Sequence, residues 1–280
     1  MLYKNGKELK MATFEIWEKP YHIKATEKQV GKYVILTGDP DRVPKIAEKL
    51  DNAELITKGR EFVLYTGELL SQPVSVCSTG IGGPSAAIAV EELVKCGADT
   101  FIRVGTCGGI DFDMTGGDLC IASAAIRCEG TSQEYLPDGY PAVADFRVTL
   151  ALIKAADKLC SGQFGDNFQV GVVQSKDSFY GEMEPEKSPV SQKLLENWES
   201  YVECGCKATE MECAAIFSVG ISKKVRCGAV LNVLWNIERR KAEIEDIVNY
   251  DTEKGIICAV EGIRNLIVED TFGVPLFSNS

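Results

Sequence analysis

The sequence predicts an α/β fold in which a largely parallel or mixed β-sheet is covered by helices on both faces. Short runs rich in β-branched residues alternate with longer segments of helical periodicity, which is typical of such folds. The run at 118–127 is apolar almost throughout, which indicates a strand that is buried on both faces. No repeat, low-complexity run or Pro/Ser-rich linker divides the 280 residues. We therefore expect a single domain over residues 1–280, with residues 1–15 and 271–280 as peripheral tails.

The expected elements follow this alternation along the chain. Apolar and β-branched runs predict strands at 34–37, 74–79, 100–104, 118–127, 168–174 and 228–235. Helical periodicity predicts helices that end near residues 50 and 95, and helices at 146–159, 189–203, 210–221 and 251–268. Asp39 is expected to cap the first helix, with Pro40 in its first turn. Ligands collect at the carboxyl ends of strands in such sheets, so the glycine-rich strand exits at 38–40, 80–84 and 105–109 are the expected site.

The bulk composition is that of a globular protein and disfavours several classes. The chain is 45% hydrophobic and 25% charged, and no apolar run approaches the ~20 residues of a membrane span. The net charge of −11 disfavours a nucleic-acid-binding surface but is compatible with a local phosphate site. Residues 1–10 are polar and lack the apolar core of a signal peptide, so we expect a cytoplasmic location.

The cysteines do not indicate a metal site. The eleven cysteines are scattered without a C-x-x-C pair, and His22 is the only histidine. Zinc sites usually have paired ligands at close spacing, so no metal is expected. Most of the thiols lie in apolar stretches, which predicts small buried hydrophobes in a reducing compartment.

Two segments have the composition of an anion site. In residues 38–42 (GDPDR) a glycine ends a strand, backbone N–H groups open a helix, and Arg42 follows in the first turn. In residues 103–109 (RVGTCGG) an arginine lies in an otherwise apolar strand. Burying it unpaired is costly, so Arg103 either grips a phosphate together with Thr106 or makes a structural salt bridge. Residues 103–109 do not match a Walker A loop, and residues 80–83 do not continue into a dinucleotide-binding fingerprint.

A third segment, residues 209–212 (TEME), lies at an expected helix start. Residues two apart in a helix point to nearly opposite sides, so Glu210 and Glu212 are not a general acid–base pair. Acidic residues in a first turn commonly serve the helix dipole. The functional alternative is that Glu212 accepts hydrogen bonds from a diol.

The ordered motifs carry more information together than separately. They are GDPxRV at 38–43, STGIGGPS at 78–85, RVGTxGGI at 103–110 and EME at 210–212, with further matches at 59–62, 141–146 and 175–181. In this order they closely resemble the nucleoside phosphorylase-I family and, within it, the uridine phosphorylases. The resemblance extends from about His22 to the last helix. It implies a central mixed, partly barrel-like β-sheet flanked by helices on both faces.

The resemblance also implies an activity. Such an enzyme is a pentosyltransferase that cleaves uridine, with deoxyuridine and thymidine as further candidates, into the base and ribose or deoxyribose 1-phosphate in nucleotide salvage. Inorganic phosphate is the co-substrate and the nucleophile, so no cofactor and no serine, cysteine or metal nucleophile is expected. Family members are commonly hexamers built as trimers of dimers, which implies a homo-oligomer with shared active sites.

Individual roles follow from the same resemblance. The residues expected to bind phosphate are Gly38, Arg42, Arg103 and Thr106, with Arg60 from a neighbouring subunit. Those expected to bind ribose are Glu210, Met211 and Glu212, with His22 from the neighbour. Those expected to bind the base are Phe179, which would stack on it, Glu182 and Lys187. The expected catalytic set is Arg103, Thr106 and Glu212.

The base end departs from the family pattern. Glu182 and Lys187 occupy the region where uridine phosphorylases carry a glutamine and an arginine. A carboxylate only accepts hydrogen bonds unless protonated, and lysine lacks the forked donors of arginine. Glu182 can accept from uracil N3–H while Lys187 donates to a carbonyl oxygen. Alternatively, Glu182 repels a departing uracil anion and favours a different base.

Three alternatives follow from this departure. The first is a purine nucleoside phosphorylase, although Asn236 stands where purine-cleaving relatives use an aspartate to protonate the base, which favours a pyrimidine. The second is a hydrolytic relative that acts on a thionucleoside, but such an enzyme would not need the arginine cluster because it does not bind phosphate. The non-enzymatic alternative is a nucleoside-binding homologue without turnover.

Overall fold

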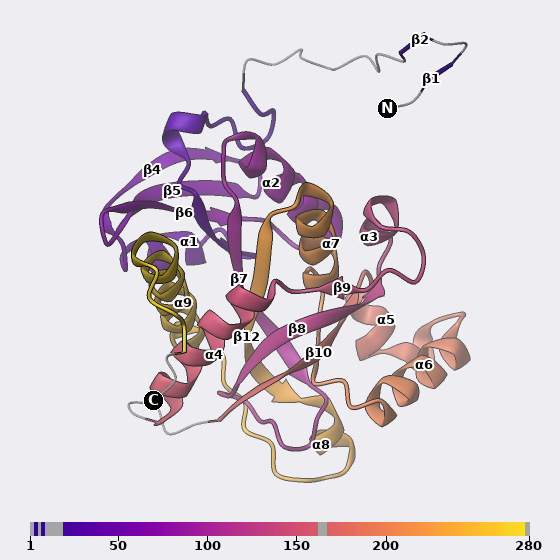
Figure 1. The fold of residues 1–280 in the computed structure, drawn as a ribbon. Coiled ribbons are helices and arrows are strands. Elements are labelled where there is room, and N and C mark those ends of the chain that lie inside the picture. Colours follow the sequence, from indigo (N-terminus) through magenta and orange to yellow (C-terminus); the bar gives the residue numbers. More distant parts are fainter. Residues whose placement is uncertain (1–2, 5–6, 9–18, 162–166, 278–280) are drawn as a thin grey trace.

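A mixed β-sheet of ten strands forms the centre of the molecule (Figure 1). The computed structural model describes residues 3–4, 7–8, 19–161 and 167–277. The strands of this sheet are β3 (Tyr33–Thr37), β4 (Asp51–Gly59), β5 (Phe62–Leu69), β6 (Gln72–Ser78), β7 (Thr100–Gly109), β8 (Leu119–Cys128), β9 (Ala142–Val143), β10 (Phe168–Lys176), β11 (Ala208–Glu210) and β12 (Arg226–Asn236). Strands β1 (Tyr3–Lys4) and β2 (Lys7–Glu8) pair separately from it.

One part of the sheet closes into a ring. The strand order is β11-β10-β8-β12-β7-β3-β6-β5-β4, and β11 pairs in addition with β7. The short strand β11 is thus parallel to β10 on one side and antiparallel to β7 on the other. Closure through β11 gives a five-stranded barrel, from which β3, β6, β5 and β4 extend as an open sheet. The predicted mixed, partly barrel-like sheet is confirmed.

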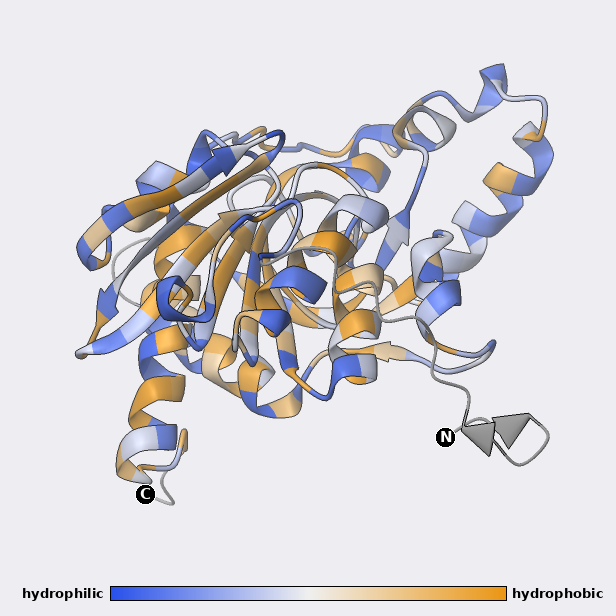
Figure 2. Cartoon of the chain, turned by 90° about the horizontal axis from the view of Figure 1, so that it is seen from above, coloured by the Kyte–Doolittle hydropathy of each residue, from blue (hydrophilic) through white to orange (hydrophobic). Residues whose placement is uncertain are grey.

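Helices cover both faces of this sheet. They are α1 (Arg42–Ala47), α2 (Gly83–Lys95), α3 (Thr131–Tyr135), α4 (Phe146–Ser161), α5 (Phe179–Met183), α6 (Ser191–Glu203), α7 (Cys213–Lys223), α8 (Ile237–Lys241) and α9 (Glu253–Phe272), with 3₁₀ turns η1 (Glu27–Gln29) and η2 (Pro185–Lys187). Helices α2 and α7 pack on one face, and α1, α4 and α9 pack on the other (Figure 1). Apolar residues concentrate on the central strands and on the helix sides that face them (Figure 2).

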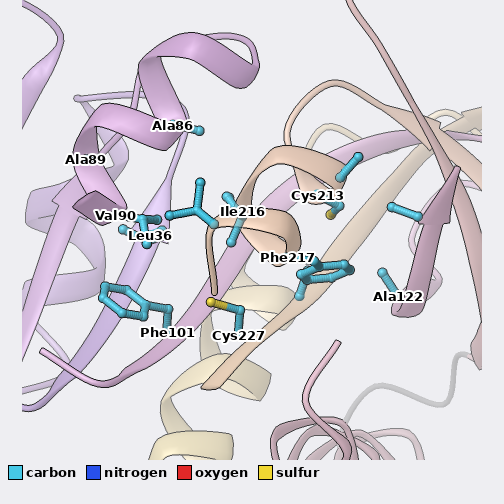
Figure 3. Packing of buried hydrophobic residues seen from close by; sticks show 14 of the residues in the cluster. Leu36, Ala86, Ala89, Val90, Phe101, Ala122, Cys213, Ile216, Phe217 and Cys227 are labelled. Atoms are coloured by element: carbon cyan, nitrogen blue, oxygen red, sulfur yellow. The ribbon is translucent and has the colours of Figure 1, made fainter. Parts of the chain in front are cut away.

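The core consists of two main clusters, one on each side of the sheet. Val90, Phe101, Ile216 and Phe217 belong to the cluster beneath α2 and α7 (Figure 3). The second cluster joins α1, α4 and α9 to the opposite face, and Leu276 from the segment expected as a tail is also buried in it. The remaining tail residues 1–2, 5–6, 9–15 and 278–280 lie outside the described residues.

Three expected boundaries are wrong, each for a local reason. The first helix begins at Arg42 because the Asp39 carboxylate accepts from the backbone N–H of Asp41 (2.9 Å) in a turn rather than capping a helix. Strand β7 continues through the glycines at 105–109 because both β12 and β11 pair with them. The helix expected from Glu210 begins at Cys213, since Glu210 ends β11.

The hairpin of β4 and β5 was not anticipated. Strand β4 lies at the edge of the sheet and is mostly exposed, so its sequence lacks the apolar run by which the six expected strands are recognised. Most of the cysteines are buried hydrophobes, as expected: Cys77, Cys96, Cys107, Cys120, Cys206, Cys213, Cys227 and Cys258.

Among the helices that the structure describes, none combines the length and the apolar character that a membrane span requires.

The cluster beneath α2 and α7 should contribute strongly to stability. Phe217 is fully buried in it, so Phe217→Ala should lower the free energy of unfolding by about 3–5 kcal/mol. The matched control is Phe272→Ala, because Phe272 is 66% exposed and should change that free energy by less than about 0.5 kcal/mol. Urea unfolding followed by circular dichroism measures both. Equal midpoints for the two variants would contradict this assignment of the core.

Candidate functional site

A cavity of about 680 Å³ lies where several strands of the sheet end. This volume is within the range of small-molecule sites, roughly 300–1,000 Å³. Its walls come from the exits of β3 and β6, the middle of β7, and the ends of β10, β11 and β12. The lining residues are Gly38, Asp39, Pro40, Arg42, Glu61, Gly80, Ile81, Arg103, Gly105, Thr106, Cys107, Gly108, Lys176, Phe179, Glu182, Met183, Thr209, Glu210, Met211, Glu212, Leu234, Trp235 and Ile237.

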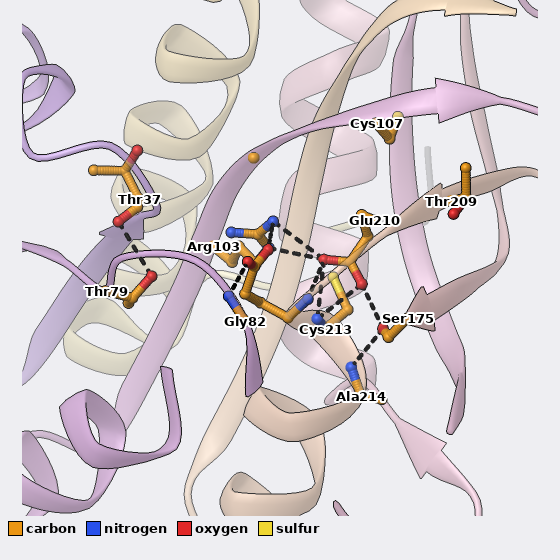
Figure 4. Close-up of polar contacts among 12 residues, drawn as sticks. Thr37, Thr79, Gly82, Arg103, Cys107, Ser175, Thr209, Glu210, Cys213 and Ala214 are labelled. Carbon is orange, nitrogen blue, oxygen red and sulfur yellow. Dashed lines mark hydrogen bonds and ion pairs between the residues drawn. The ribbon is translucent and has the colours of Figure 1, made fainter. Parts of the chain in front are cut away.

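At the centre of the cavity wall, one buried arginine meets two carboxylates (Figure 4). Arg103 projects from β7 and is only 3% exposed. Its Nη2 lies 2.5 Å from Glu212 Oε2 and 3.1 Å from Glu210 Oε2, and its Nε donates to Glu210 Oε2 at 3.2 Å. The two roles considered for Arg103, a structural salt bridge and a contact with phosphate, are therefore compatible. The guanidinium is in a buried salt bridge and also lines the cavity.

The hydrogen bonds of the Glu210 carboxylate hold the start of α7. Its Oε2 accepts from the backbone N–H of Glu212 (2.8 Å) and Cys213 (3.0 Å), and its Oε1 accepts from the Ser175 hydroxyl. These N–H groups are free at a helix start, and a carboxylate there stabilises the helix dipole. Glu210 therefore positions Arg103 and α7, and its expected contact with ribose stays a prediction.

Glu212 is held differently and keeps access to the cavity. Its Oε1 accepts from the backbone N–H of Gly82 (2.6 Å), in the loop after β6, while its Oε2 faces Arg103. Burial raises the pKa of Glu212, the charge of Arg103 opposes this, and the nearby Glu210 carboxylate raises it further. The net direction is upward because one guanidinium is shared by two buried carboxylates. Burial lowers the pKa of Arg103, but Glu212 and Glu210 outweigh burial and raise it.

A glycine in β7 makes room for this cluster. A Cβ on Gly105 would lie 2.7 Å from Arg103 Nη2 and 2.7 Å from a methyl group of Leu231. Any side chain at this position would therefore displace the guanidinium. The glycine of the RVGT motif is required by the position of Arg103.

A second arginine, Arg42, lines the cavity near Arg103. We refer to this part of the cavity as its arginine end. Arg42 begins α1, and its Nη1 donates to the Thr37 hydroxyl at 3.2 Å. Burial lowers the pKa of Arg42, and the positive charge of Arg103 lowers it further, although Asp39 partly offsets both. An anion bound between the two guanidinium groups would relieve this repulsion. Gly38 and Thr106 line the same end, so the structure brings together four of the residues expected to bind phosphate.

The opposite end of the cavity has an aromatic ring and a charged pair. Phe179 and Glu182 line it, as expected, together with Met183 and Trp235. Lys176, the last residue of β10, also lies here, with its Nζ 2.9 Å from Glu182 Oε1. Sequence reasoning missed Lys176, although its place at a strand end was the available signal. Met211 and Glu212 also line the cavity.

Three expected site residues lie outside this cavity in the single chain. Lys187 is exposed in η2, and its Nζ pairs with Glu184 at 2.8 Å. Arg60 is exposed in the turn between β4 and β5. His22 lies in a separate cavity, where its Nδ1 is 2.8 Å from Glu92 Oε1. Arg60 and His22 were expected from a neighbouring subunit, so only Lys187 is placed differently from its expected position.

Two further side chains have roles that bear on the chemistry. Asn236 is buried, and its amide donates to the carbonyls of Asp111 (2.7 Å) and Met114 (2.9 Å) and caps α8 at Arg239. Asn236 therefore serves the backbone and does not line the cavity. Cys107 does line it, but burial raises the pKa of its thiol well above the ordinary range. The neutral thiol is a poor nucleophile.

Comparison with known proteins agrees with this geometry. The family model described as the phosphorylase superfamily matches residues 32–255. A uridine phosphorylase of Treponema pallidum is 49% identical over 251 residues, which cover 90% of this chain and 95% of that protein. A uridine phosphorylase of Escherichia coli is 35% identical, covering 88% of this chain and 98% of that protein. A guanosine phosphorylase of Halorubrum lacusprofundi is 37% identical, covering 78% and 84%. The chain belongs to the phosphorylase superfamily.

Proposed function

We propose that this protein cleaves uridine with inorganic phosphate, releasing uracil and ribose 1-phosphate. One arrangement carries the proposal: a single cavity is lined by a pair of arginines, by a buried glutamate that pairs with one of them, and by an aromatic ring with polar partners. The strand register places the arginines beside the exit of β3 and the polar partners beside β11, as phosphate and base would lie on either side of the sugar in such a reaction. The names of the relatives from Treponema pallidum and Escherichia coli support uridine as the substrate.

The residues of this chain suit each step. Arg42 and Arg103 would hold phosphate with one oxygen directed at C1′ of the ribose, and such positioning can be worth several kcal/mol. Glu212 would accept hydrogen bonds from the ribose hydroxyls. As the phosphate oxygen bonds to C1′, the bond from C1′ to N1 breaks and its electron pair leaves with the base. The fixed charges around the sugar would stabilise its oxocarbenium character in the transition state.

A second candidate function rests on a relative. The guanosine phosphorylase of Halorubrum lacusprofundi matches over 219 residues, so a purine substrate is the alternative. Asn236 no longer decides against it, because its amide serves the backbone. We favour uridine as the substrate because the relative at 49% identity is a uridine phosphorylase.

We also propose that the active protein is a homo-oligomer, namely a hexamer built as a trimer of dimers. It would act in the cytoplasm, in nucleotide salvage. In one subunit Arg60 and His22 lie away from the cavity. A neighbour that supplied them would add a cation at the phosphate end and a donor near the 5′ end of the sugar.

A substrate panel tests the proposed reaction. Release of free base should require phosphate, and uridine and deoxyuridine should be cleaved faster than inosine, guanosine or cytidine. Chromatography of base and sugar phosphate after incubation with each nucleoside measures this. Cleavage of inosine or guanosine without cleavage of uridine or deoxyuridine would establish the purine alternative. Tight nucleoside binding without turnover at any phosphate concentration would establish the non-enzymatic one.

Arg103→Ala should abolish most phosphate-dependent turnover. It removes a preorganised charge and leaves Glu210 and Glu212 buried without their cation, so kcat/KM should fall at least about 10²-fold. The control is Arg147→Ala, because Arg147 makes a similar ion pair with Glu269 (2.9 Å) on the surface, far from the cavity lining. Initial rates over a range of phosphate concentrations give kcat/KM for phosphate in both variants. Activity near wild type in Arg103→Ala would exclude the proposed phosphate site.

The raised pKa of Glu212 predicts a particular pH dependence. Glu212 must be ionised to pair with Arg103 and to accept from ribose, so kcat/KM should fall as the pH drops through its pKa. Since that pKa is raised, this acidic limb should lie above the ordinary glutamate value of about 4.3. Glu212→Gln should remove the limb and lower the plateau. A limb that is identical in wild type and Glu212→Gln would assign it to another group.

A further inference from the structure

Two buried side chains, Lys176 and Thr209, meet the largely buried Glu182 carboxylate at the base end of the cavity. Lys176 Nζ lies 2.9 Å from Glu182 Oε1 and donates to the Thr209 hydroxyl at 2.6 Å. The same hydroxyl lies 2.7 Å from Glu182 Oε2 and 2.6 Å from Gln174 Oε1. Lys176 is 7% exposed and Thr209 is 3% exposed. All three side chains of this Lys176–Glu182–Thr209 cluster line the cavity.

The barrel closure determines where the Thr209 hydroxyl lies. In β11, Thr209 pairs with Gln174 of β10 on one side and with Gly108 of β7 on the other. Its backbone is therefore held by two strands, and Thr209 lies beside the cluster around Glu210 (Figure 4). The partners of Thr209 are less constrained. Lys176 has a flexible four-carbon stem, and Glu182 lies in the short helix α5, so both need a fixed group to face the same way.

A count of donors and acceptors shows what the cluster offers a ligand. An ammonium group has three donors, and those of Lys176 that bind described residues go to Glu182 and Thr209, which leaves one. The carboxylate has about four acceptor positions, of which Lys176 and Thr209 use two. The hydroxyl accepts from Lys176 and donates its single proton to Glu182 or Gln174. The cluster thus presents one donor beside free acceptor positions.

We infer that Thr209 is a positioning residue that sets the Lys176–Glu182 pair to read the C(=O)–N–H edge of the base. The inference rests on the proposed function. Uracil presents a carbonyl oxygen for Lys176 and an N3–H for Glu182. The glycosidic bond and stacking on Phe179 fix the ring, so the unprotonated N3 of cytosine would face the carboxylate instead. Two acceptors in contact without a proton are costly in a buried site.

The ion pair between Lys176 and Glu182 also changes how Glu182 would affect a departing base anion. A lone carboxylate beside the base would oppose the negative charge that develops as the base leaves. Lys176 makes the pair neutral overall and directs its remaining donor toward the base. Glu182 can therefore select the N–H of the base without repelling the leaving group.

The test compares the dissociation constants of uridine and cytidine by calorimetry in phosphate-free buffer, where phosphorolysis cannot proceed. Wild type should bind uridine at least about ten-fold more tightly than cytidine, the equivalent of one hydrogen bond to a charged group. Thr209→Val keeps the shape of the side chain but removes the hydroxyl, and it should reduce this preference to about three-fold or less. Thr209→Ala, which adds no methyl group next to the charges, should do the same. Thr209→Ser should restore the preference.

Thr100→Val is the matched control. Thr100 is a fully buried threonine on β7 whose hydroxyl accepts from Arg226 (2.7 Å) and donates to Asp99 (2.7 Å), away from the residues that line the cavity. It should lower the melting temperature and leave the uridine-to-cytidine ratio unchanged. Equal binding of the two nucleosides by wild type, or an unchanged ratio in both Thr209→Val and Thr209→Ala, would overturn the inference. These outcomes are independent of turnover, whereas failure of the proposed function would appear as absence of phosphorolysis in the substrate panel.

Discussion

The burial of one positive charge organises this site. Arg103 lies inside a strand that is otherwise apolar, where an unpaired guanidinium would be very costly. Two carboxylates compensate it, and each carboxylate is in turn held by backbone N–H groups: Glu210 by the start of α7 and Glu212 by Gly82 in the loop after β6. The arginine thereby ties β7, β11, α7 and this loop into one arrangement. The cation proposed to bind phosphate and the carboxylate proposed to bind ribose are consequently parts of a single charged cluster.

The closure of the barrel by β11 gives that cluster its rigidity. Because β11 pairs with both β10 and β7, the residues at its end have little freedom to move. Glu210 ends this strand and holds Arg103, and Thr209 precedes it and contacts Lys176 and Glu182. One three-residue strand thus fixes both the cluster around Arg103 and the Lys176–Glu182–Thr209 cluster in the wall of the cavity. Preorganised groups of this kind stabilise a transition state without reorganising during the reaction.

Sequence patterns predicted those parts of the fold and site that local chemistry dictates. Buried strands and amphipathic helices were recognisable from their periodicity, and Arg103 was conspicuous as a charge in an apolar run. The edge strand β4 was missed because most of its residues are exposed, so its sequence has no continuous apolar run. Lys176 and Lys187 could not be told apart, since only the tertiary arrangement turns one into the cavity and leaves the other exposed. Asn236 matches the position of the aspartate of purine-cleaving relatives in sequence, but only the tertiary structure shows that its amide binds backbone carbonyls.

The central claim is that phosphate, held by the arginines, is the group that attacks the sugar. The most direct test is to run the reaction with uridine and phosphate in water enriched in ¹⁸O and to analyse the sugar product by mass spectrometry. The account predicts ribose 1-phosphate without ¹⁸O at C1′, because the new bond to C1′ comes from a phosphate oxygen. Free ribose in place of ribose 1-phosphate, released at the same rate without phosphate, would show that water attacks, and it would contradict the role assigned here to Arg42 and Arg103.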